Sequence, residues 1–208
     1  MASRFLGTRF TLALLGAAAA FALWAPTAGA GLLSTGPAAT CETNASQPFR
    51  PWSDQANYVL MPGGSFEGGA PGWTLKGGAA VRSGNESFFV RSSTDRYSLY
   101  LPAGGTAMTP TMCFTLGDWH LRFFVKKAAA GSGSIKVTVH VKTLLGVLSV
   151  LDGGTVSASG YWTPSPRVGL LLSNVTSLVG TRAVSFQFRA SGTAFQVDDV
   201  YLDPWKSY

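Results

Sequence analysis

Few residues in this 208-residue sequence are of the types that perform acid–base or nucleophilic chemistry. It contains two histidines, His120 and His140, and three glutamates. No zinc-ligand spacing, P-loop, dinucleotide fingerprint or Gly-x-Ser-x-Gly nucleophile elbow occurs. The sequence therefore predicts that the protein is not an enzyme, with a small hydrolase as a distant alternative. Both histidines are interpreted as surface residues.

Side chains of the kind that bind sugars occur at alternating positions of three segments. Aromatic rings stack on the apolar faces of pyranoses, and amide, carboxylate and guanidinium groups hydrogen-bond the hydroxyls. If these segments, residues 119–127, 135–142 and 184–189, are neighbouring strands, they form one polar face with an exposed phenyl ring. Tyr161 and Trp162 would lie in a loop at the rim of this face. The predicted ligand-binding residues are Phe124, Tyr161, Trp162, Arg122, Gln187 and Arg189, with Lys136 and His140 beside them. The alternative is that the aromatic rings pack in the core or under loops.

Short segments of alternating polarity predict an all-β fold. From Ile135 to Lys142 every odd position is apolar and β-branched and every even position is polar, and residues 184–189 and 119–127 repeat this alternation. Weaker strand candidates lie at 58–61, 73–76, 88–91, 98–101, 111–116, 147–151 and 168–172. About ten short strands with one buried face are typical of a two-sheet antiparallel β-sandwich. We expect one such domain, a jelly roll, over residues 57–208.

Composition and charge argue against a disordered chain and against a nucleic-acid-binding protein. The chain is 46% hydrophobic and 12% charged, which is typical of a folded globular protein. The formal net charge is +6, but the basic residues are scattered singly along the chain. This scatter argues against a nucleic-acid-binding stripe.

The first thirty residues predict export. Arg4 and Arg9 precede an apolar run from Phe10 to Trp24, and Ala28-Gly29-Ala30 follows as a small-residue cleavage site. This order is typical of a secretory signal peptide, and the run is shorter than a membrane span. We expect cleavage after residue 30, a secreted mature protein and no membrane span in it.

The two cysteines, Cys41 and Cys113, form an even count in a chain predicted to reach an oxidising compartment. A disulfide between them is therefore expected, with two free buried thiols as the alternative. It would tie an irregular leader, residues 31–56, to the sandwich. The leader aromatics Phe49 and Trp52 are expected to dock on the domain.

The alternation of apolar and polar residues shifts by one position near the C-terminus. The apolar residues Phe195 and Val197 stand at odd positions, whereas Val200 and Leu202 stand at even positions. A β-bulge between the two pairs would keep all four inward. It would also place Asp198 on the inward parity, where its carboxylate needs hydrogen bonds or a cation.

Two motifs at the ends of the domain carry a family resemblance. Gly64-Ser65-Phe66-Glu67 with Gly72-Trp73, and the closing run 197–202 (Val-Asp-Asp-Val-Tyr-Leu), resemble the ends of galactose-binding-like jelly rolls, a fold of many carbohydrate-binding modules. The match brackets residues 57–203, although Gly63 stands where that family has Asn. The closing run 198–204, Asp-Asp-Val-Tyr-Leu-Asp-Pro, also resembles the ends of exported actinobacterial proteins of unknown role. The resemblance implies that the first and last strands are neighbours.

The same resemblance implies a structural calcium ion held by Glu67 and Asp198. Backbone carbonyls would complete a shell of oxygen ligands, which suits calcium. The alternative is that Asp198 only caps the bulge through backbone N–H groups.

Together these features predict an exported, non-catalytic β-sandwich that binds carbohydrate, a cell-wall or environmental glycan. The alternative is a structural or protein-interaction component of the cell envelope. The expected partners are therefore a polysaccharide or a cell-envelope component, and not a nucleic acid.

Overall fold

The computed structural model describes residues 44–114, 120–142, 148–169 and 182–203. The predicted signal peptide, residues 1–30, and Cys41 lie outside the described residues. The backbone of Cys113 lies in a strand, but its expected partner is not described, so the Cys41 to Cys113 disulfide stays a prediction. Within the described ranges, no helix is both long and apolar enough to cross a membrane.

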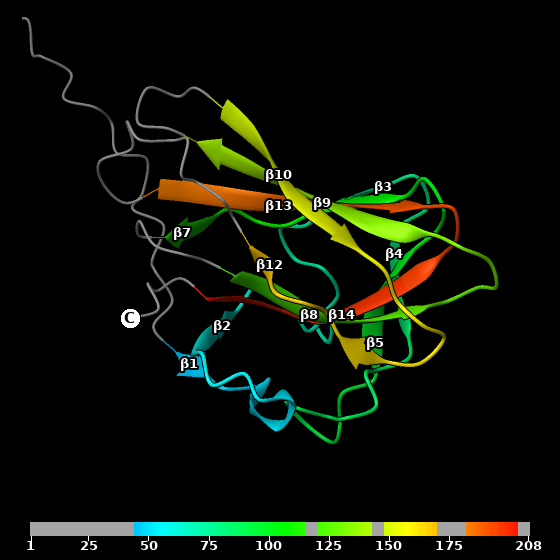
Figure 1. Ribbon diagram of the computed structural model, residues 1–208, viewed down its shortest axis with the longest axis horizontal. Helices are drawn as coiled ribbons and strands as arrows, with labels where there is room; N and C mark the ends of the chain where they lie inside the picture. The colour runs from blue at the N-terminus through cyan, green and yellow to red at the C-terminus, as the bar shows by residue number, and fades with distance from the viewer. Residues whose placement is uncertain (1–43, 115–119, 143–147, 170–181, 204–208) are drawn as a thin grey trace, which may run out of the picture. The chain divides into compact units, whose positions relative to one another are not determined.

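The described chain forms two antiparallel sheets, one above the other in Figure 1. Sheet A has the order β1 (Ala45–Ser46), β2 (Tyr58–Leu60), β14 (Phe195–Asp203), β5 (Tyr97–Leu101) and β4 (Ala80–Ser83). β8 (His120–Lys127) pairs with β14 and also with β11 (Thr163–Pro164) and β12 (Val168–Gly169). Sheet B has the order β10 (Leu148–Val156), β9 (Ser134–Lys142), β13 (Arg182–Ser191), β6 (Thr106–Met108) and β3 (Thr74–Lys76), with β7 (Met112–Phe114) beside β13. The predicted two-sheet antiparallel β-sandwich is confirmed.

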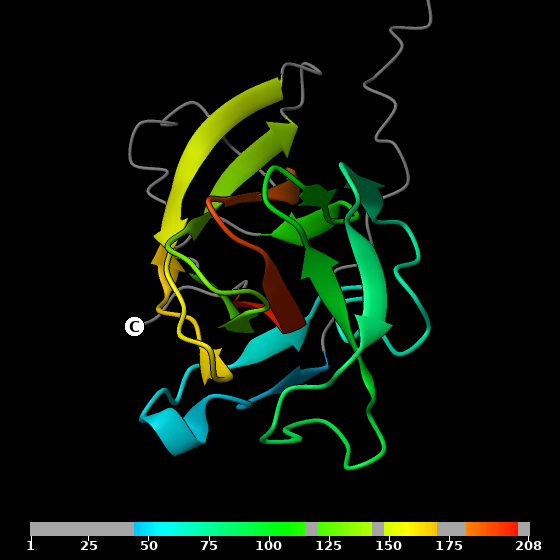
Figure 2. The same ribbon diagram turned by 90° about the vertical axis from the view of Figure 1, so that its right-hand side faces the viewer.

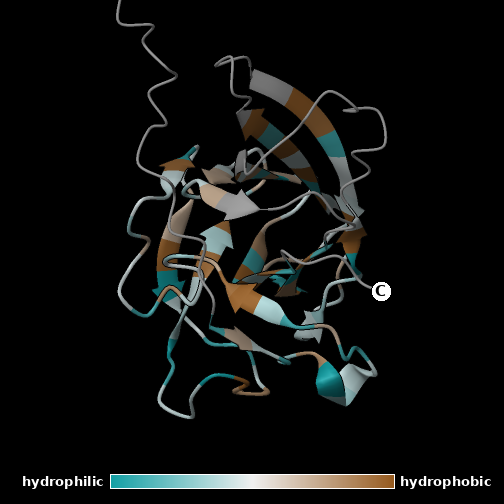
Figure 3. Ribbon diagram, turned by 90° about the vertical axis from the view of Figure 1, so that its left-hand side faces the viewer, coloured by the Kyte–Doolittle hydropathy of each residue, from teal (hydrophilic) through white to brown (hydrophobic). Residues whose placement is uncertain are grey.

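Alternating strand positions fill the core between the sheets. On β9 the buried residues include Ile135, Val137 and Val139, and on β13 they include Phe186 and Phe188. β9 and β10 form a curved antiparallel pair (Figure 2), and polar and apolar bands alternate along the long strands in Figure 3. The period of two therefore separates a core face from an outer face in each sheet, as the sequence predicted.

The single polar face expected from three strands does not exist. β9 and β13 are neighbours in sheet B, but β8 belongs to sheet A. Alternation gives the side of a strand on which a residue lies, and it carries no information on which sheet contains the strand. Arg122 and Phe124 are therefore separated from Gln187 and Arg189.

The predicted β-bulge is confirmed in β14. The pairing register with β8 shifts between Asp198 and Tyr201, and Asp199 has a φ of 45°. Val197 and Val200 both lie in the core between the sheets. β14 also pairs with β2, so the first and last strands of the domain are neighbours.

The position of Asp198 differs from the sequence prediction. Val197 faces the core, so Asp198, the next residue, lies on the outer face of sheet A, opposite Phe124 in the register. Its side chain is nevertheless 0% exposed, because the loop between β4 and β5 covers this part of the sheet. Asp198 is thus buried as predicted, but on the other side of the sheet.

A second apolar cluster lies on the outer face of sheet A. Its buried members are Phe49, Tyr58, Phe124, Trp162 and Tyr201. The Phe49 ring stacks on Phe124 at 5.3 Å between centroids, and Trp52 of η1 (Arg50–Trp52) contacts Phe124 edge-on. The predicted docking of the leader aromatics is confirmed. Together with the Phe88 ring, the leader buries Phe124 completely, so the prediction that this ring is exposed for sugar binding is wrong.

Buried charges fasten the leader to β8. Arg122 Nη1 donates to Asp54 Oδ2 at 2.5 Å, and Tyr58 Oη donates to the same oxygen at 2.7 Å. Arg167 also donates to the Asp54 carboxylate, and Arg122 donates from Nε and Nη2 to the carbonyl of Ser165 at 3.0 and 2.8 Å. Because Asp54 and Ser165 enclose Arg122, its predicted role as a solvent-facing ligand is wrong.

This network predicts a large loss of stability on removing the Asp54 charge. Asp54→Asn leaves the Arg122 guanidinium buried beside a neutral amide, and breaking a buried pair in this way costs roughly 3 kcal/mol. Asp152→Asn is the matched control, because Asp152 pairs with Lys136 on the surface and should leave stability unchanged. Urea unfolding at pH 7 measures both variants. Equal stability of Asp54→Asn and the wild type would contradict the prediction.

The same carboxylate predicts a loss of stability in acid. Burial raises the pKa of Asp54, but hydrogen bonds from Arg167, Tyr58 and Arg122 outweigh burial and hold it well below its usual range. A lowered folded-state pKa gives stability that is fully present above the unfolded pKa, near pH 4, and is lost as the pH falls further. The stability difference between wild type and Asp54→Asn should therefore shrink between about pH 4 and pH 2 in urea titrations. A constant difference would show that Asp54 does not titrate in this way.

Candidate functional site

The outer face of sheet A is covered at one end and open at the other. Along β8, Arg122 and Phe124 are buried by the leader, whereas Lys126 is half-buried. Gln196 of β14 is opposite both Lys126 and Tyr100 of β5 in the register. These side chains therefore lie in one row across three strands, at the part of the face that the leader leaves open.

Two aromatic rings flank this row. The guanidinium carbon of Arg82 lies 3.7 Å from the centroid of the Tyr100 ring, and Lys126 Nζ lies 4.9 Å from that of Trp162. Each ring therefore has a cation over its face. We name this set the sheet A platform; its residues are Arg82, Tyr100, Gln196, Lys126 and Trp162.

The central amide of the platform is held in place. Gln196 Nε2 donates to Ser98 Oγ at 3.1 Å and contacts the carbonyl oxygen of Ser83 at 3.4 Å. Ser98 is itself buried on the outer side of β5. With neighbouring strands about 5 Å apart, Tyr100 and the start of β11 after Trp162 are separated by roughly 15 Å. The platform is therefore long enough for an extended ligand that runs across the strands.

The predicted rim residues differ in their exposure. Tyr161 is 82% exposed, and its backbone is held by Ser159, whose Oγ accepts a hydrogen bond from Tyr161 N at 3.2 Å. Trp162 is only 8% exposed, because its ring packs in the second cluster beneath Lys126. Tyr161 is thus available at the edge of the platform, and Trp162 mainly supports it.

Gln187 and Arg189 lie far from these residues in the topology. Both are on β13, on the outer face of sheet B, where Gln187 is half-buried and Arg189 is exposed. Their register partners on β9 are Thr138 and Lys136. The structure therefore splits the predicted ligand-binding residues between two separate faces.

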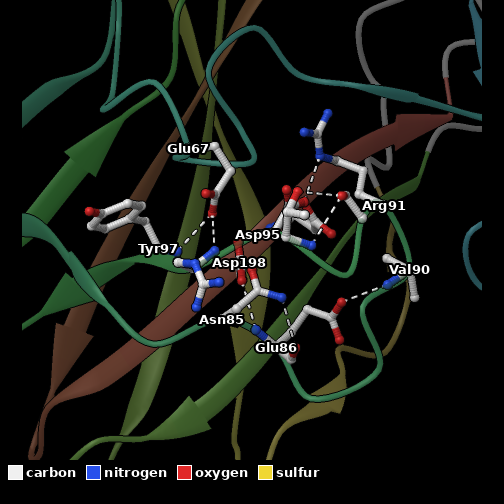
Figure 4. A network of polar contacts seen from close by, with 12 residues as sticks. Glu67, Asn85, Glu86, Val90, Arg91, Asp95, Tyr97 and Asp198 are labelled. Carbon is white, nitrogen blue, oxygen red and sulfur yellow. Dashed lines mark hydrogen bonds and ion pairs between the residues drawn. The ribbon is translucent and has the colours of Figure 1, made fainter.

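The loop from Gly84 to Arg96 lies on the same side of the platform as the leader and is built on a buried carboxylate (Figure 4). Glu86 accepts hydrogen bonds from the backbone N–H groups of Val90 and Phe88, and its own N–H donates to Asp198 Oδ2 at 2.9 Å. Asp198 Oδ1 accepts from Asp199 N at 2.8 Å. The loop is therefore tied to the bulge of β14.

More carboxylates surround this contact. Arg91 Nε lies 3.1 Å from Asp95 Oδ2 and 3.9 Å from Asp199 Oδ1. Glu67 Oε1 accepts hydrogen bonds from the backbone N–H groups of Arg96 and Tyr97 at 2.8 and 2.7 Å (Figure 4). We name Glu86, Asp95, Asp198 and Asp199 the acidic cluster.

Burial shifts the protonation of this cluster. Loss of hydration raises the pKa of Asp198 to about 9, and the charge of Asp199 acts in the same direction. Burial and the Glu86 charge raise the pKa of Asp199 to about 7, against the opposing effect of Arg91. The pKa of Glu86 is also raised, again chiefly by burial. The cluster therefore has more carboxylates than nearby positive charge can balance.

The hydrogen bonds of Glu67 and Asp198, the predicted calcium ligands, determine which of their oxygen atoms could still bind a cation. In the described ranges, no group of three or more Asp, Glu, His or Cys side chains is arranged to hold a metal ion. Both Asp198 oxygens accept backbone hydrogen bonds, as the bulge-cap alternative expects. Each Asp198 oxygen keeps a second lone pair, whereas Glu67 Oε1 already accepts two hydrogen bonds, so Glu67 could offer a cation only Oε2. A calcium ion would therefore need backbone carbonyls to complete its shell.

Sequence reasoning missed four platform residues: Arg82, Tyr100, Gln196 and Lys126. A signal for two of them was present. Tyr100 lies between Leu99 and Leu101, and Gln196 lies between Phe195 and Val197, so alternation predicts that both face outward. What the pattern lacked was the pairing of β5 with β14, which joins segments almost a hundred residues apart.

Comparisons with known proteins assign no family. The sequence matches no protein-family model and no curated protein. Similar solved structures include the CBM22-1 xylan-binding domain of Paenibacillus barcinonensis Xyn10C, at 15% identity over 74% of this chain and 97% of that one, with a TM-score of 0.46. TmCBM61 in complex with β-1,4-galactotriose is similar at 16% identity over 71% and 98%, with a TM-score of 0.42. Scores this low establish neither a shared family nor a ligand.

Proposed function

We propose that this protein is an exported, non-catalytic β-sandwich that binds carbohydrate on the sheet A platform. The single observation that carries the proposal is the row formed by Tyr100, Gln196 and Lys126 across three strands, beside the exposed Tyr161. The exposed Tyr161 ring, the Gln196 amide and the Lys126 ammonium group together offer the apolar and hydrogen-bonding contacts that a sugar ring requires.

Preorganisation supports this function. The Tyr100 ring is fixed beneath Arg82, and the Gln196 amide is fixed by Ser98, so little side-chain freedom is lost when a ligand binds. The carboxylates nearest the platform, Asp198 and Glu86, are buried and bonded to backbone N–H groups. The platform is thus suited to binding rather than to proton transfer.

A protein partner is the second candidate, and one observation favours it. Phe88 and Phe89 are 44% and 47% exposed in the loop that Glu86 holds, the Phe88 ring packs edge-on against Trp52, and Phe89 has a φ of 51°. A non-glycine residue in this strained region that presents an apolar ring to solvent is typical of a contact site. This surface would suit a component of the cell envelope.

Substitution of the platform tests the carbohydrate proposal. Affinity electrophoresis of the residue 31–208 protein against xylan, β-1,4-galactan and other neutral glycans should show retardation, without release of reducing ends. Tyr100→Ala and Gln196→Ala should each weaken binding about tenfold, since each removes a central contact. Tyr97→Ala is the control, because this tyrosine lies on the same strand outside the platform and is 44% exposed. Retardation that survives both platform variants would refute the site.

A structural calcium ion at Glu67 and Asp198 is part of the proposal. The acidic cluster has four buried carboxylates and Arg91 as its nearby cation, so a hard divalent ion would stabilise the ionised carboxylates in place of the protons that burial favours. Such an ion would stabilise the loop from Gly84 to Arg96 against the β14 bulge.

Thermal melting tests the calcium site. Saturating calcium should raise the melting temperature over that in chelator by roughly 5–10 °C, because the ion binds the folded state alone. Asp198→Asn should abolish this difference, whereas Asp152→Asn on the surface should keep it. Identical melting curves with calcium and with chelator would leave Asp198 as a bulge cap.

A further inference from the structure

The outer face of sheet B gathers positive charge in one row. Lys76 of β3 is opposite Thr106 of β6, which is opposite Arg189 of β13, and Arg189 is opposite Lys136 of β9. The Cα atoms of Lys76 and Lys136 are thus about three strand spacings, or roughly 15 Å, apart. We name Lys76, Arg189 and Lys136 the cationic row.

All three cations point away from the core. Each alternates with a residue packed in the core between the sheets: Leu75 before Lys76, Phe188 before Arg189 and Ile135 before Lys136. All three side chains are exposed. They belong to strands far apart in the sequence, so their alignment results from the sheet register alone.

The positions between and beside the cations offer hydroxyl and amide groups. Thr106 and Thr155 lie in the same row, and Thr138 and Gln187 face each other in the next row. No aromatic residue occupies either row in the described part of this face. The face therefore provides charge and hydrogen bonds without rings for stacking.

In the described ranges, few acidic side chains lie at the surface to balance these cations. Six of the described acidic residues are buried: Asp54, Glu86, Asp95, Asp198, Asp199 and Asp203. Glu67 is half-buried and bonded to backbone N–H groups. Asp152 is exposed on this face and pairs with Lys136 at 3.1 Å, which leaves Lys76 and Arg189 to attract an anion.

We propose that the outer face of sheet B is a second binding surface, and that its ligand is an acidic polysaccharide lying across the strands along the cationic row. Carboxylates spaced along such a chain would pair with Lys76 and Arg189, and its hydroxyls would bond the intervening Thr and Gln side chains. A single-stranded nucleic acid fits less well, because its binding depends on stacking of bases on aromatic rings. This surface is independent of the sheet A platform.

Binding to polygalacturonate tests the proposal. The double variant Lys76→Gln/Arg189→Gln should lower affinity at least about tenfold and weaken the salt dependence of binding. The control is Arg50→Gln/Arg96→Gln, which removes the same charge from exposed residues elsewhere and should bind like the wild type. Both double variants should melt like the wild type, because they alter exposed side chains.

Three further measurements distinguish this surface from the sheet A platform and from unspecific attraction of polyanions. Tyr100→Ala should leave polygalacturonate binding unchanged, and Lys76→Gln/Arg189→Gln should leave any binding of neutral β-1,4-galactan unchanged, so this proposal and the platform can fail separately. Polyglutamate and single-stranded DNA should bind more weakly than polygalacturonate at equal salt. Equal loss of affinity in the two double variants would overturn the proposal, as would equal binding of all polyanions or no binding of polygalacturonate.

Discussion

The buried pair between Asp54 and Arg122 determines which part of sheet A meets solvent. It joins the segment that precedes β2 to the middle of β8, and Tyr58 and Arg167 complete the hydrogen bonding of the carboxylate. A carboxylate and a guanidinium this deeply buried are tolerated because they satisfy each other. With this contact in place, Phe49 packs on Phe124, and the open part of the outer face begins only at Lys126.

A second constraint acts on the same side of the platform, next to the leader. The bulge in β14 brings two consecutive aspartates beneath the loop from Gly84 to Arg96, and Asp198 bonds the backbone of Glu86. Glu86 then shapes the loop that presents Phe88 and Phe89. Buried carboxylates therefore define two features of the outer face of sheet A: the extent of the platform and the form of the loop beside it.

The described acidic side chains are mostly buried and the basic ones mostly exposed, and this difference affects the outer faces of both sheets. Asp54 and the acidic cluster stabilise loops and bulges by accepting hydrogen bonds, and they are withdrawn from the surface by this role. Among the residues that the structure describes, the exposed charged side chains are consequently mostly basic. The two outer faces differ accordingly: sheet A combines aromatic rings with cations, and sheet B combines cations with hydroxyl groups.

The sequence by itself determined the all-β sandwich, the inward positions of strands such as 135–141, and the bulge that keeps Val197 and Val200 in the core. These features follow from local alternation, because a period of two assigns each residue to one side of its strand. The tertiary structure alone decided what lies on the outer sides. It covered Arg122 and Phe124 with the leader, placed β8 and β13 in different sheets, and aligned the scattered Lys76, Arg189 and Lys136. Such outcomes depend on which distant strands pair and which loops fold over them, and alternation within one strand is independent of both.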